Sequence, residues 1–138
     1  MDRPIRIAIN GFGRIGRAVA RQWMLMEAPR AFELIAINDI APIETCAYLL
    51  EYDSVYGLAP AKIEQSECAL ILNGHSVRFS HQNDFGSTNM SDIAVVFECT
   101  GKATTAYFSA AGLRAGAQRV LISCPSAHAD LTAIFSSN

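Results

Sequence analysis

The amino-acid sequence predicts a doubly wound α/β fold, in which helices cover both faces of a mostly parallel sheet. Short apolar runs rich in β-branched residues alternate with segments of helical periodicity. The runs are nearly continuous rather than alternating, which is typical of strands buried on both faces. A glycine-rich G-x-G-x-x-G motif follows the first run and opens the first helical segment. Strand, helix and strand in succession imply right-handed crossovers and an open parallel sheet.

The first half of the chain supplies two predicted strands and two predicted helices. Residues 3–10 form an apolar run that ends at a glycine, and residues 14–26 carry apolar side chains at helical spacing. Residues 32–37 form the second apolar run. A second helix is expected over 42–52, beginning at a proline. Its apolar face is expected to comprise Ile43, Cys46, Ala47 and Leu50.

The second half begins with a predicted β-hairpin. Residues 69–72 and 76–79 flank Asn73-Gly74-His75, and Asn-Gly between two such runs strongly favours a hairpin. Residues 131–135 are compatible with a last strand. Three further elements are expected: a central strand over 93–99, a helix over 104–115 that stops near Gly116, and a buried strand over 120–123.

Composition excludes several classes of protein. The chain has 138 residues, of which 51% are hydrophobic and 17% charged, as expected of one folded domain over residues 1–138. The net charge of -2 gives no general attraction to a phosphate backbone, so nucleic-acid binding is not expected. No stretch approaches the ~20 apolar residues of a membrane span, and the first residues lack a signal-peptide pattern. Four cysteines without CxxC spacing favour reduced thiols in the cytoplasm, and no metal site is expected.

Each glycine of the motif has a physical task in the predicted context. Gly11 permits a tight turn, and Gly13 has no Cβ to keep the backbone away from a pyrophosphate. Gly16 lets the helix pack closely on the first strand. The free N–H groups at Arg14 and Ile15, at the positive end of the helix dipole, favour phosphate groups.

Asp39 ends the second predicted strand about 20 residues after the last glycine of the motif. A carboxylate there accepts hydrogen bonds from a ribose diol and repels a 2′-phosphate, which favours NAD over NADP. The alternative is that Asp39 only caps the following turn and that the glycines form only a tight turn.

At these residues the sequence resembles a known family. Residues 6–17 closely resemble the opening of glyceraldehyde-3-phosphate dehydrogenases and the related erythrose-4-phosphate dehydrogenases. The resemblance implies a Rossmann-type NAD-binding domain with a β-hairpin insertion. Further segments match in order: Asn38-Asp39, Tyr52-Asp53-Ser54 with Gly57, Glu98-Cys99-Thr100-Gly101, residues 115–117, and residues 120–123 with Pro125.

The resemblance implies NAD as the cofactor and a role for each matching residue. Arg14 and Ile15 would donate backbone N–H groups to the pyrophosphate, Asn10 would support the turn, and Asp39 would hold the adenosine ribose. The remaining residues would form the turn or line the groove. The complete set of cofactor-binding residues is Asn10, Gly11, Phe12, Gly13, Arg14, Ile15, Gly16, Asp39, Thr100, Gly101 and Ser123.

Several positions depart from the family pattern. The arginine that the family usually places near the adenine falls on Asn83, and not on the nearby Arg78. Val55-Tyr56 replace a Thr-His pair, and the segment 84–92 is shorter than in relatives and lacks their tryptophan. These changes predict a divergent member with weaker binding on the adenine side.

The family's catalytic motif, Ser-x-Cys-Thr-Thr-Asn, is not found in this sequence. On the alignment the chain ends at Asn138 before that motif would arrive, so the catalytic domain is expected to be absent and no catalytic residue is assigned. Cys124 is the best substitute nucleophile because it follows a predicted strand end, whereas Cys99 is expected inside a buried strand. Neither has a histidine beside it in the sequence.

By resemblance, the intact enzyme oxidises a sugar-phosphate aldehyde through a thiohemiacetal, with hydride transfer to NAD and release of the acyl group to phosphate. It is usually a homotetramer, and the isolated domain is expected to self-associate through an exposed apolar surface. Two alternatives stay open: erythrose 4-phosphate as the substrate, or a free-standing NAD-binding or regulatory module without catalysis.

Two surface features have simpler interpretations. Arg17 and Arg21, an i, i+4 pair on the first helix, are expected on a solvated face. Trp23 is expected in the core.

The 138-residue polypeptide is predicted not to turn over, because acyl transfer needs an activated cysteine and a base within hydrogen-bond reach. The measurement is NADH formation with glyceraldehyde 3-phosphate and phosphate. Reduction of NAD that thiol alkylation abolishes would overturn the prediction.

Overall fold

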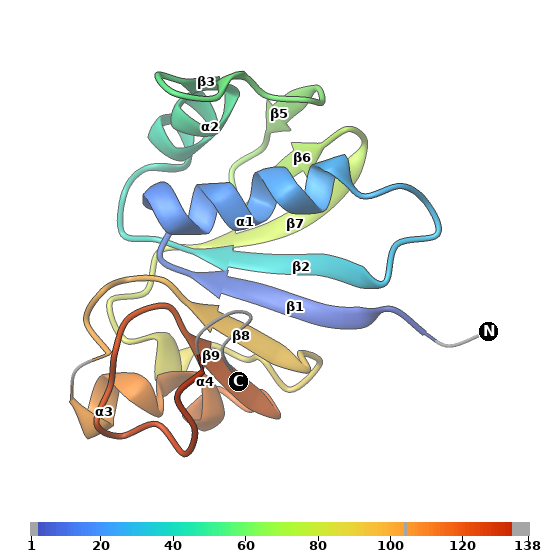
Figure 1. The fold of residues 1–138 in the computed structure, drawn as a ribbon. Coiled ribbons are helices and arrows are strands. Elements are labelled where there is room, and N and C mark those ends of the chain that lie inside the picture. Colours follow the sequence, from blue (N-terminus) through green and yellow to red (C-terminus); the bar gives the residue numbers. More distant parts are fainter. Residues whose placement is uncertain (1–2, 104, 134–138) are drawn as a thin grey trace.

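The main sheet has seven strands in the order β5-β6-β7-β2-β1-β8-β9. The computed structural model describes residues 3–103 and 105–133 (Figure 1). Strands β7, β2, β1, β8 and β9 run parallel, whereas β6 pairs antiparallel with both β5 and β7. The strands are β1 (Ile5–Asn10), β2 (Phe32–Asn38), β5 (Ile63–Gln65), β6 (Ala69–Leu72), β7 (His75–Ser80), β8 (Val95–Glu98) and β9 (Arg119–Ile122).

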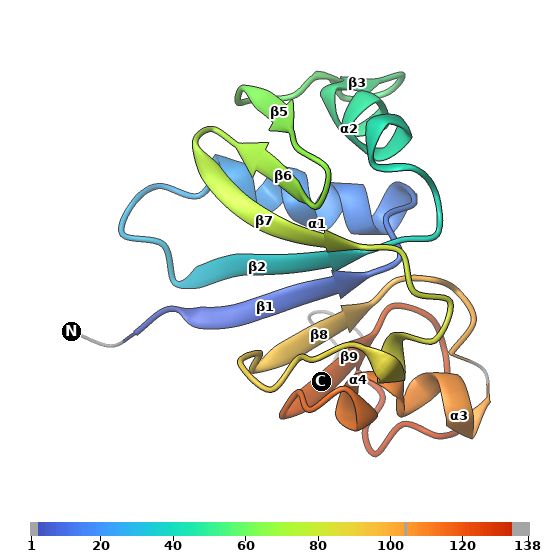
Figure 2. The same cartoon turned by 180° about the vertical axis from the view of Figure 1, so that it is seen from behind.

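Helices cover both faces of this sheet, as the doubly wound prediction requires. The helices α1 and α2 lie on one face, and η1, α3 and α4 lie on the other (Figures 1 and 2). A small ribbon of β3 (Tyr52–Asp53) and β4 (Gly57–Leu58) follows α2. The helices are α1 (Arg14–Leu25), α2 (Ile43–Glu51), η1 (Phe85–Ser87), α3 (Ala106–Ser109) and α4 (Ala111–Arg114).

Two apolar clusters fill the spaces between the sheet and its helices. Because side chains alternate along a strand, Ile7 and Ile9 join the cluster under α1 and α2, while Ala8 between them joins the cluster under α4. Trp23 lies in the first cluster with 2% of its surface exposed, which confirms its expected place in the core. The four residues expected on the apolar face of α2 are all buried: Ile43, Cys46, Ala47 and Leu50.

The expectation of a solvated face on α1 is wrong for Arg21. Its side chain is buried, and the guanidinium donates hydrogen bonds to the carbonyl oxygens of Leu50 at 2.6 Å and Gly57 at 2.8 Å. Leu50 lies in the last turn of α2, where carbonyl groups have no partner within the helix, so a buried donor is needed there. Arg17 is half-buried and donates to the carbonyl oxygen of Phe12 at 3.0 Å. The periodicity of α1 could not indicate that another helix ends against it.

The hairpin prediction is confirmed, and the helix prediction after β8 needs correction. Asn73 and Gly74 connect β6 to β7 with φ angles of 52° and 86°, as a tight two-residue turn requires.

The helix expected over 104–115 is two short helices, α3 and α4, separated at Ala110 with φ -95° and ψ 2°. Gly112 seats the second one against the sheet, because a Cβ there would lie 2.6 Å from the Cγ2 of Val120. Gly116, with φ 107°, ends the segment as predicted.

Strand β9 is not buried as expected. Its residues alternate between exposed and half-buried, and Leu121 has 55% of its surface exposed, because no strand among the described residues pairs with its outer edge. The last strand expected over 131–135 is not formed at residues 131–133, and residues 134–135 lie outside the described residues. Within the described part of the chain, no helix is long and apolar enough to cross a membrane.

Four polar side chains stand in register at the carboxyl ends of four adjacent strands. Ser80, Asn38, Asn10 and Glu98 end β7, β2, β1 and β8, and each is the register partner of the next. Their hydrogen bonds run in one direction across the sheet. Ser80 Oγ donates to Asn38 Oδ1 at 2.7 Å, Asn38 Nδ2 to Asn10 Oδ1 at 3.0 Å, and Asn10 Nδ2 to Glu98 Oε1 at 2.7 Å. We refer to these four residues as the polar row.

The side chain of Asn38 uses its whole hydrogen-bonding capacity. Besides its two partners in the polar row, its Oδ1 accepts from the N–H of Gln82 at 2.9 Å and its Nδ2 donates to the carbonyl oxygen of Gln82 at 3.0 Å. Asn38 is 3% exposed, so any loss of these bonds leaves polar groups buried without partners. The polar row therefore holds the strand ends and the segment after β7 in one arrangement.

Asn38→Asp is predicted to lower the free energy of unfolding by about 3 kcal/mol at pH 7, because a carboxylate faces two acceptors where the amide donated. The loss should shrink as the pH falls and the carboxyl group gains a proton that it can donate. Urea unfolding from pH 4 to pH 7 measures both effects. Asn73→Asp, the same change in the exposed hairpin turn, is the control and should alter stability by less than about 0.5 kcal/mol. Equal effects of the two variants would contradict this role of Asn38.

Candidate functional site

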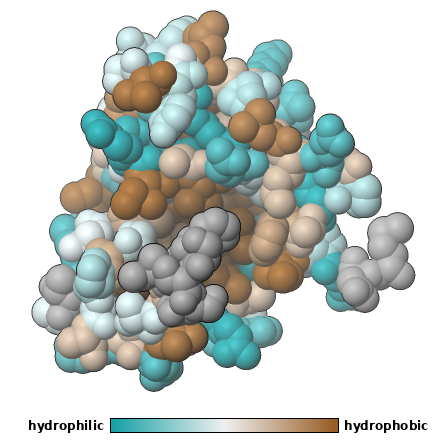
Figure 3. Space-filling view, viewed as in Figure 1, coloured by the Kyte–Doolittle hydropathy of each residue, from teal (hydrophilic) through white to brown (hydrophobic). Residues whose placement is uncertain are grey.

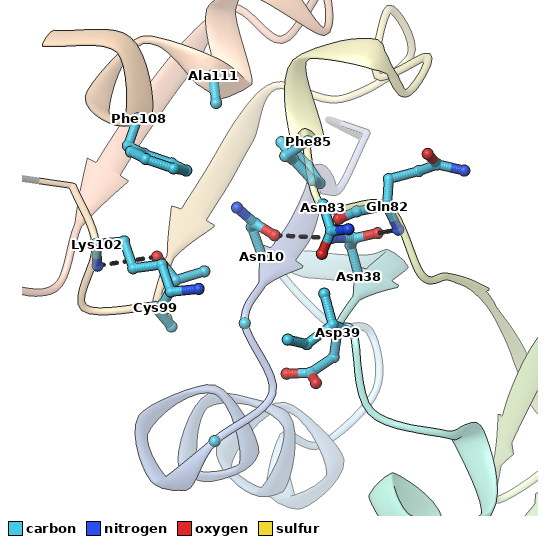
Figure 4. A pocket seen from close by; sticks show the side chains of 14 residues that line it. Asn10, Asn38, Asp39, Gln82, Asn83, Phe85, Cys99, Lys102, Phe108 and Ala111 are labelled. Carbon is cyan, nitrogen blue, oxygen red and sulfur yellow. Dashed lines mark hydrogen bonds between the residues drawn. The ribbon is translucent and has the colours of Figure 1, made fainter. Parts of the chain in front are cut away.

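A pocket of about 260 Å³ opens at the carboxyl edge of the parallel strands (Figure 4). It lies where the strand order reverses, since β1 leads into α1 on one face of the sheet and β8 leads toward α3 and α4 on the other. Open α/β sheets bind ligands at such a switch point. The lining residues are Asn10, Gly11 and Gly13 after β1; Asn38, Asp39 and Ile40 after β2; Gln82, Asn83 and Phe85 after β7; Cys99, Thr100 and Lys102 after β8; and Phe108 and Ala111.

Two glycines of the motif are required by packing, and the third leaves open space. Gly11 has a φ of 92°, and a Cβ there would lie 2.7 Å from the backbone nitrogen of Thr100. A Cβ on Gly16 would overlap the carbonyl oxygen of Gly11, so α1 could not pack as closely on the turn. A Cβ on Gly13 would meet nothing within 4 Å, on the wall of the pocket. The first turn of α1 also contains no acidic side chain that would occupy its free N–H groups.

The Asp39 carboxylate ties the glycine turn to the end of β2. Its Oδ2 accepts from the N–H of Phe12 at 2.6 Å, and its Oδ1 accepts from the N–H of Ala41 at 2.8 Å. Asp39 therefore does cap the following turn, as the alternative interpretation held, but it is also half-exposed and lines the pocket. Each carboxylate oxygen keeps a further lone pair for a ligand on the pocket side.

The side of the pocket after β8 is organised by Glu98. This carboxylate is 2% exposed, and its Oε2 accepts from the N–H of Thr100 at 3.0 Å and from Thr100 Oγ1 at 2.7 Å. Thr100 Oγ1 in turn accepts from the N–H of Lys102 at 3.1 Å. The loop that follows β8 is thus anchored to the polar row.

Cys99 does not lie inside a buried strand, as was expected, but follows the end of β8 and lines the pocket. Burial, reinforced by the nearby charge of Glu98, raises the pKa of its thiol to about 11, while a hydrogen bond with Ser123 acts in the opposite direction. The thiol is therefore protonated at neutral pH and a poor nucleophile.

The structure gathers only part of the set of residues expected to bind the cofactor. Asn10, Gly11, Gly13, Asp39 and Thr100 line the pocket. Phe12 is buried with its ring against Phe79, and Gly16 is buried beneath the glycine turn. Arg14 and Ile15 are exposed in the first turn of α1, Gly101 is exposed beyond Thr100, and Ser123 follows β9 beside Cys99. None of these six residues is among those that line the pocket.

Asn83, and not Arg78, lies at the pocket, as the alignment through the hairpin indicated. The guanidinium of Arg78 forms a two-pronged pair with Asp92, at 2.8 and 3.1 Å, and lowers the pKa of that carboxyl group. Arg78 is thus held away from the pocket.

Sequence reasoning did not assign the side chains of Asn38, Gln82 and Glu98 to the site. A signal for two of them was present, because Asn38 and Glu98 each end an apolar run just as Asn10 does. Gln82 offered no such signal, since its place depends on the course of the chain after β7. Among the described residues, no group of three or more histidine, cysteine or acidic side chains is placed to hold a metal ion.

The comparison with protein families agrees with this geometry. Residues 5–106 match the family described as "Glyceraldehyde 3-phosphate dehydrogenase, NAD binding domain".

Individual relatives extend the similarity over nearly the whole chain. The chain is 39% identical over 135 residues to the glyceraldehyde-3-phosphate dehydrogenase of Cereibacter sphaeroides, 37% over 137 residues to that of Xanthobacter flavus, and 38% over 135 residues to that of Thermotoga maritima. These alignments cover 97%, 97% and 96% of this chain but 40% of each relative, so the chain spans about two fifths of their length. The chain belongs to the NAD-binding domain family of the glyceraldehyde-3-phosphate dehydrogenases, and its cofactor is NAD.

Proposed function

We propose that the pocket at the ends of β1, β2 and β8 holds the adenosine and pyrophosphate parts of NAD, as the cofactor site of an enzyme that oxidises a sugar-phosphate aldehyde. The observation that carries the proposal is the glycine turn at the start of α1 beside the Asp39 carboxylate. The turn supplies donors for phosphate, and the carboxylate supplies acceptors for a ribose diol.

The pyrophosphate is proposed to bind at the N-terminus of α1. This helix has 12 residues, and the N–H groups of Arg14 and Ile15 in its first turn have no partner within the helix. The open space at Gly13 lets phosphate oxygens approach the backbone there. The helix dipole adds a partial positive charge at the same place.

The two ends of the adenosine would meet different surfaces. Asp39 is proposed to accept from the ribose hydroxyl groups and to repel a 2′-phosphate, which favours NAD over NADP. Figure 4 shows Phe85 and Phe108 on opposite sides of the pocket, where their rings supply apolar walls for an adenine. Asn83 can offer that ring only an amide, so a weaker adenine-side contact is expected than with an arginine.

The catalytic step is assigned to the whole protein and not to the residues described here. The four cysteines are free thiols, none of them hydrogen-bonded to a histidine among the described residues. His81 instead places its Nδ1 2.9 Å from the carbonyl oxygen of Asp39, and its ring lies against Phe79. We therefore propose that the nucleophile and the base belong to parts of the protein outside this chain. The proposed substrate is glyceraldehyde 3-phosphate, with erythrose 4-phosphate as the alternative.

A cellular location and an oligomeric state are also proposed for the protein. Free cysteines suit a reducing compartment, which supports a cytoplasmic protein.

A homotetramer is proposed for the whole protein. Self-association is proposed for the isolated chain, because Figure 3 shows hydrophobic side chains gathered in a hollow on the α1 face. The apolar pocket on that face is lined by Ile7, Val19, Gln22, Trp23, Met26, Phe32 and Phe97.

The isolated chain is predicted to bind NAD with a Kd on the order of 0.1–1 mM, or about -4 to -5.5 kcal/mol, and to prefer NAD to NADP in a calorimetric titration. Gly13→Ala should weaken binding about tenfold without loss of stability, because its methyl group enters the open space at the turn. Asp39→Asn should lower the preference for NAD over NADP, since the repulsion of a 2′-phosphate is removed.

Glu67→Gln, an acid-to-amide change at an exposed position between β5 and β6, is the matched control and should leave the preference unchanged. Failure of the folded wild-type chain to bind NAD would refute the proposed site.

Cys99 is predicted to resist alkylation at pH 8. Its thiol has a pKa of about 11 in place of the ordinary 9.0, and at a pH well below both values this lowers the fraction of thiolate about 100-fold. Its reaction with iodoacetamide should accelerate as the pH rises toward 11, as measured by peptide mass spectrometry. The exposed Cys68 serves as the internal reference and should react first. Alkylation of Cys99 at pH 8 as fast as that of Cys68 would contradict the raised pKa.

A further inference from the structure

The pocket contains one cationic side chain among the described residues that line it, and this is Lys102. Its other ionisable side chains are the Asp39 carboxylate and the thiol of Cys99, and Glu98 lies buried directly behind the wall. A pyrophosphate brings further negative charge to this acidic surrounding. The helix dipole of α1, equivalent to about half an elementary charge, and the guanidinium of Arg17, which donates to the carbonyl oxygen of Phe12 in the turn, offset part of it from the α1 side.

The position of Lys102 is determined on both sides. Thr100 is anchored to Glu98 through its hydroxyl and its N–H, and it accepts a hydrogen bond from the N–H of Lys102. Ala103 is fully buried directly after it. The lysine is therefore an exposed residue of a short loop whose backbone is held on both sides of it.

The lysine stands across the pocket from the ribose-binding side. Figure 4 shows Lys102 and Cys99 on one side and Asp39, Gln82 and Asn83 on the other. No ion pair engages Lys102 among the described residues, whereas Lys62, the other lysine of the chain, pairs with Glu64 at 3.6 Å. The ammonium group is thus available to a ligand.

We propose that Lys102 binds the pyrophosphate of NAD from the β8 side, opposite the N-terminus of α1. The two phosphate groups would then lie between backbone N–H groups on one side and an ammonium group on the other. This inference rests on the proposed binding of NAD in the pocket, and it assigns to this chain a charged contact besides the glycine turn. An ammonium ion suits the task because it acts as a point charge on phosphate oxygens without a fixed orientation.

The test is a titration of the wild-type chain, Lys102→Met and Lys62→Met with adenosine, ADP and NAD at two salt concentrations. Lys102→Met should weaken ADP and NAD binding about 5-fold at low salt and leave adenosine within about 2-fold, because only the phosphates contact the ammonium group. At about 1 M salt, where the Debye length falls to ~3 Å, the difference should shrink below about 2-fold. Lys62→Met removes the same charge at a distance and should match the wild type throughout.

The outcomes separate this inference from the proposed function. Wild-type binding of NAD that depends on Gly13, with no effect of Lys102→Met on ADP or NAD, overturns the role of Lys102 alone. Equal losses for adenosine and ADP would mean that the lysine shapes the pocket and does not bind phosphate. Equal effects of the two lysine variants would mean that Lys102 acts only through the net charge of the chain and not through contact with the phosphates. Absence of NAD binding by the folded wild-type chain overturns both proposals.

Discussion

The polar row is the interaction on which both the sheet edge and the site depend. Ser80, Asn38, Asn10 and Glu98 end four adjacent parallel strands at equal register, and each donates to the next or accepts from it. Asn38, Asn10 and Glu98 are buried and therefore costly to leave unpaired, so the strand ends cannot slide relative to one another without breaking several bonds. The row also ends in a carboxylate that accepts two more hydrogen bonds from Thr100.

This arrangement explains why the walls of the pocket lie close together. The glycine turn leaves β1 directly after Asn10, and the loop with Thr100 leaves β8 directly after Glu98 and Cys99. Gly11 permits the two loops to touch, since a side chain there would overlap the backbone of Thr100. Asp39 then joins the turn to the end of β2 through the N–H of Phe12. The groove is therefore positioned by buried hydrogen bonds and backbone contact, while the side chains that face a ligand stay free to bind it.

The sequence indicated which residues lie at the pocket where their position follows from a local motif. Gly11, Gly13 and Asp39 are such residues, because a strand, a turn and a helix in succession place them without reference to the rest of the chain. It predicted less well where a residue acts through a distant partner. Arg21 was expected on a solvated face because nothing in α1 shows that α2 and the β3–β4 ribbon end against it. Cys99 was expected inside a strand, although β8 ends one residue earlier, where Glu98 closes the polar row.

By itself, the sequence determined the fold class, the order of the main elements and the family, since periodicity, turn residues and short motifs are properties of neighbouring residues. It also determined the hairpin at Asn73-Gly74, where two residues suffice to favour the turn. Only the tertiary structure decided which strand ends share hydrogen bonds, that β9 lies at an edge of the described sheet, and that Lys102 faces Asp39 across a pocket. Those features depend on strand order and on packing between segments far apart in the chain, and no local pattern records them.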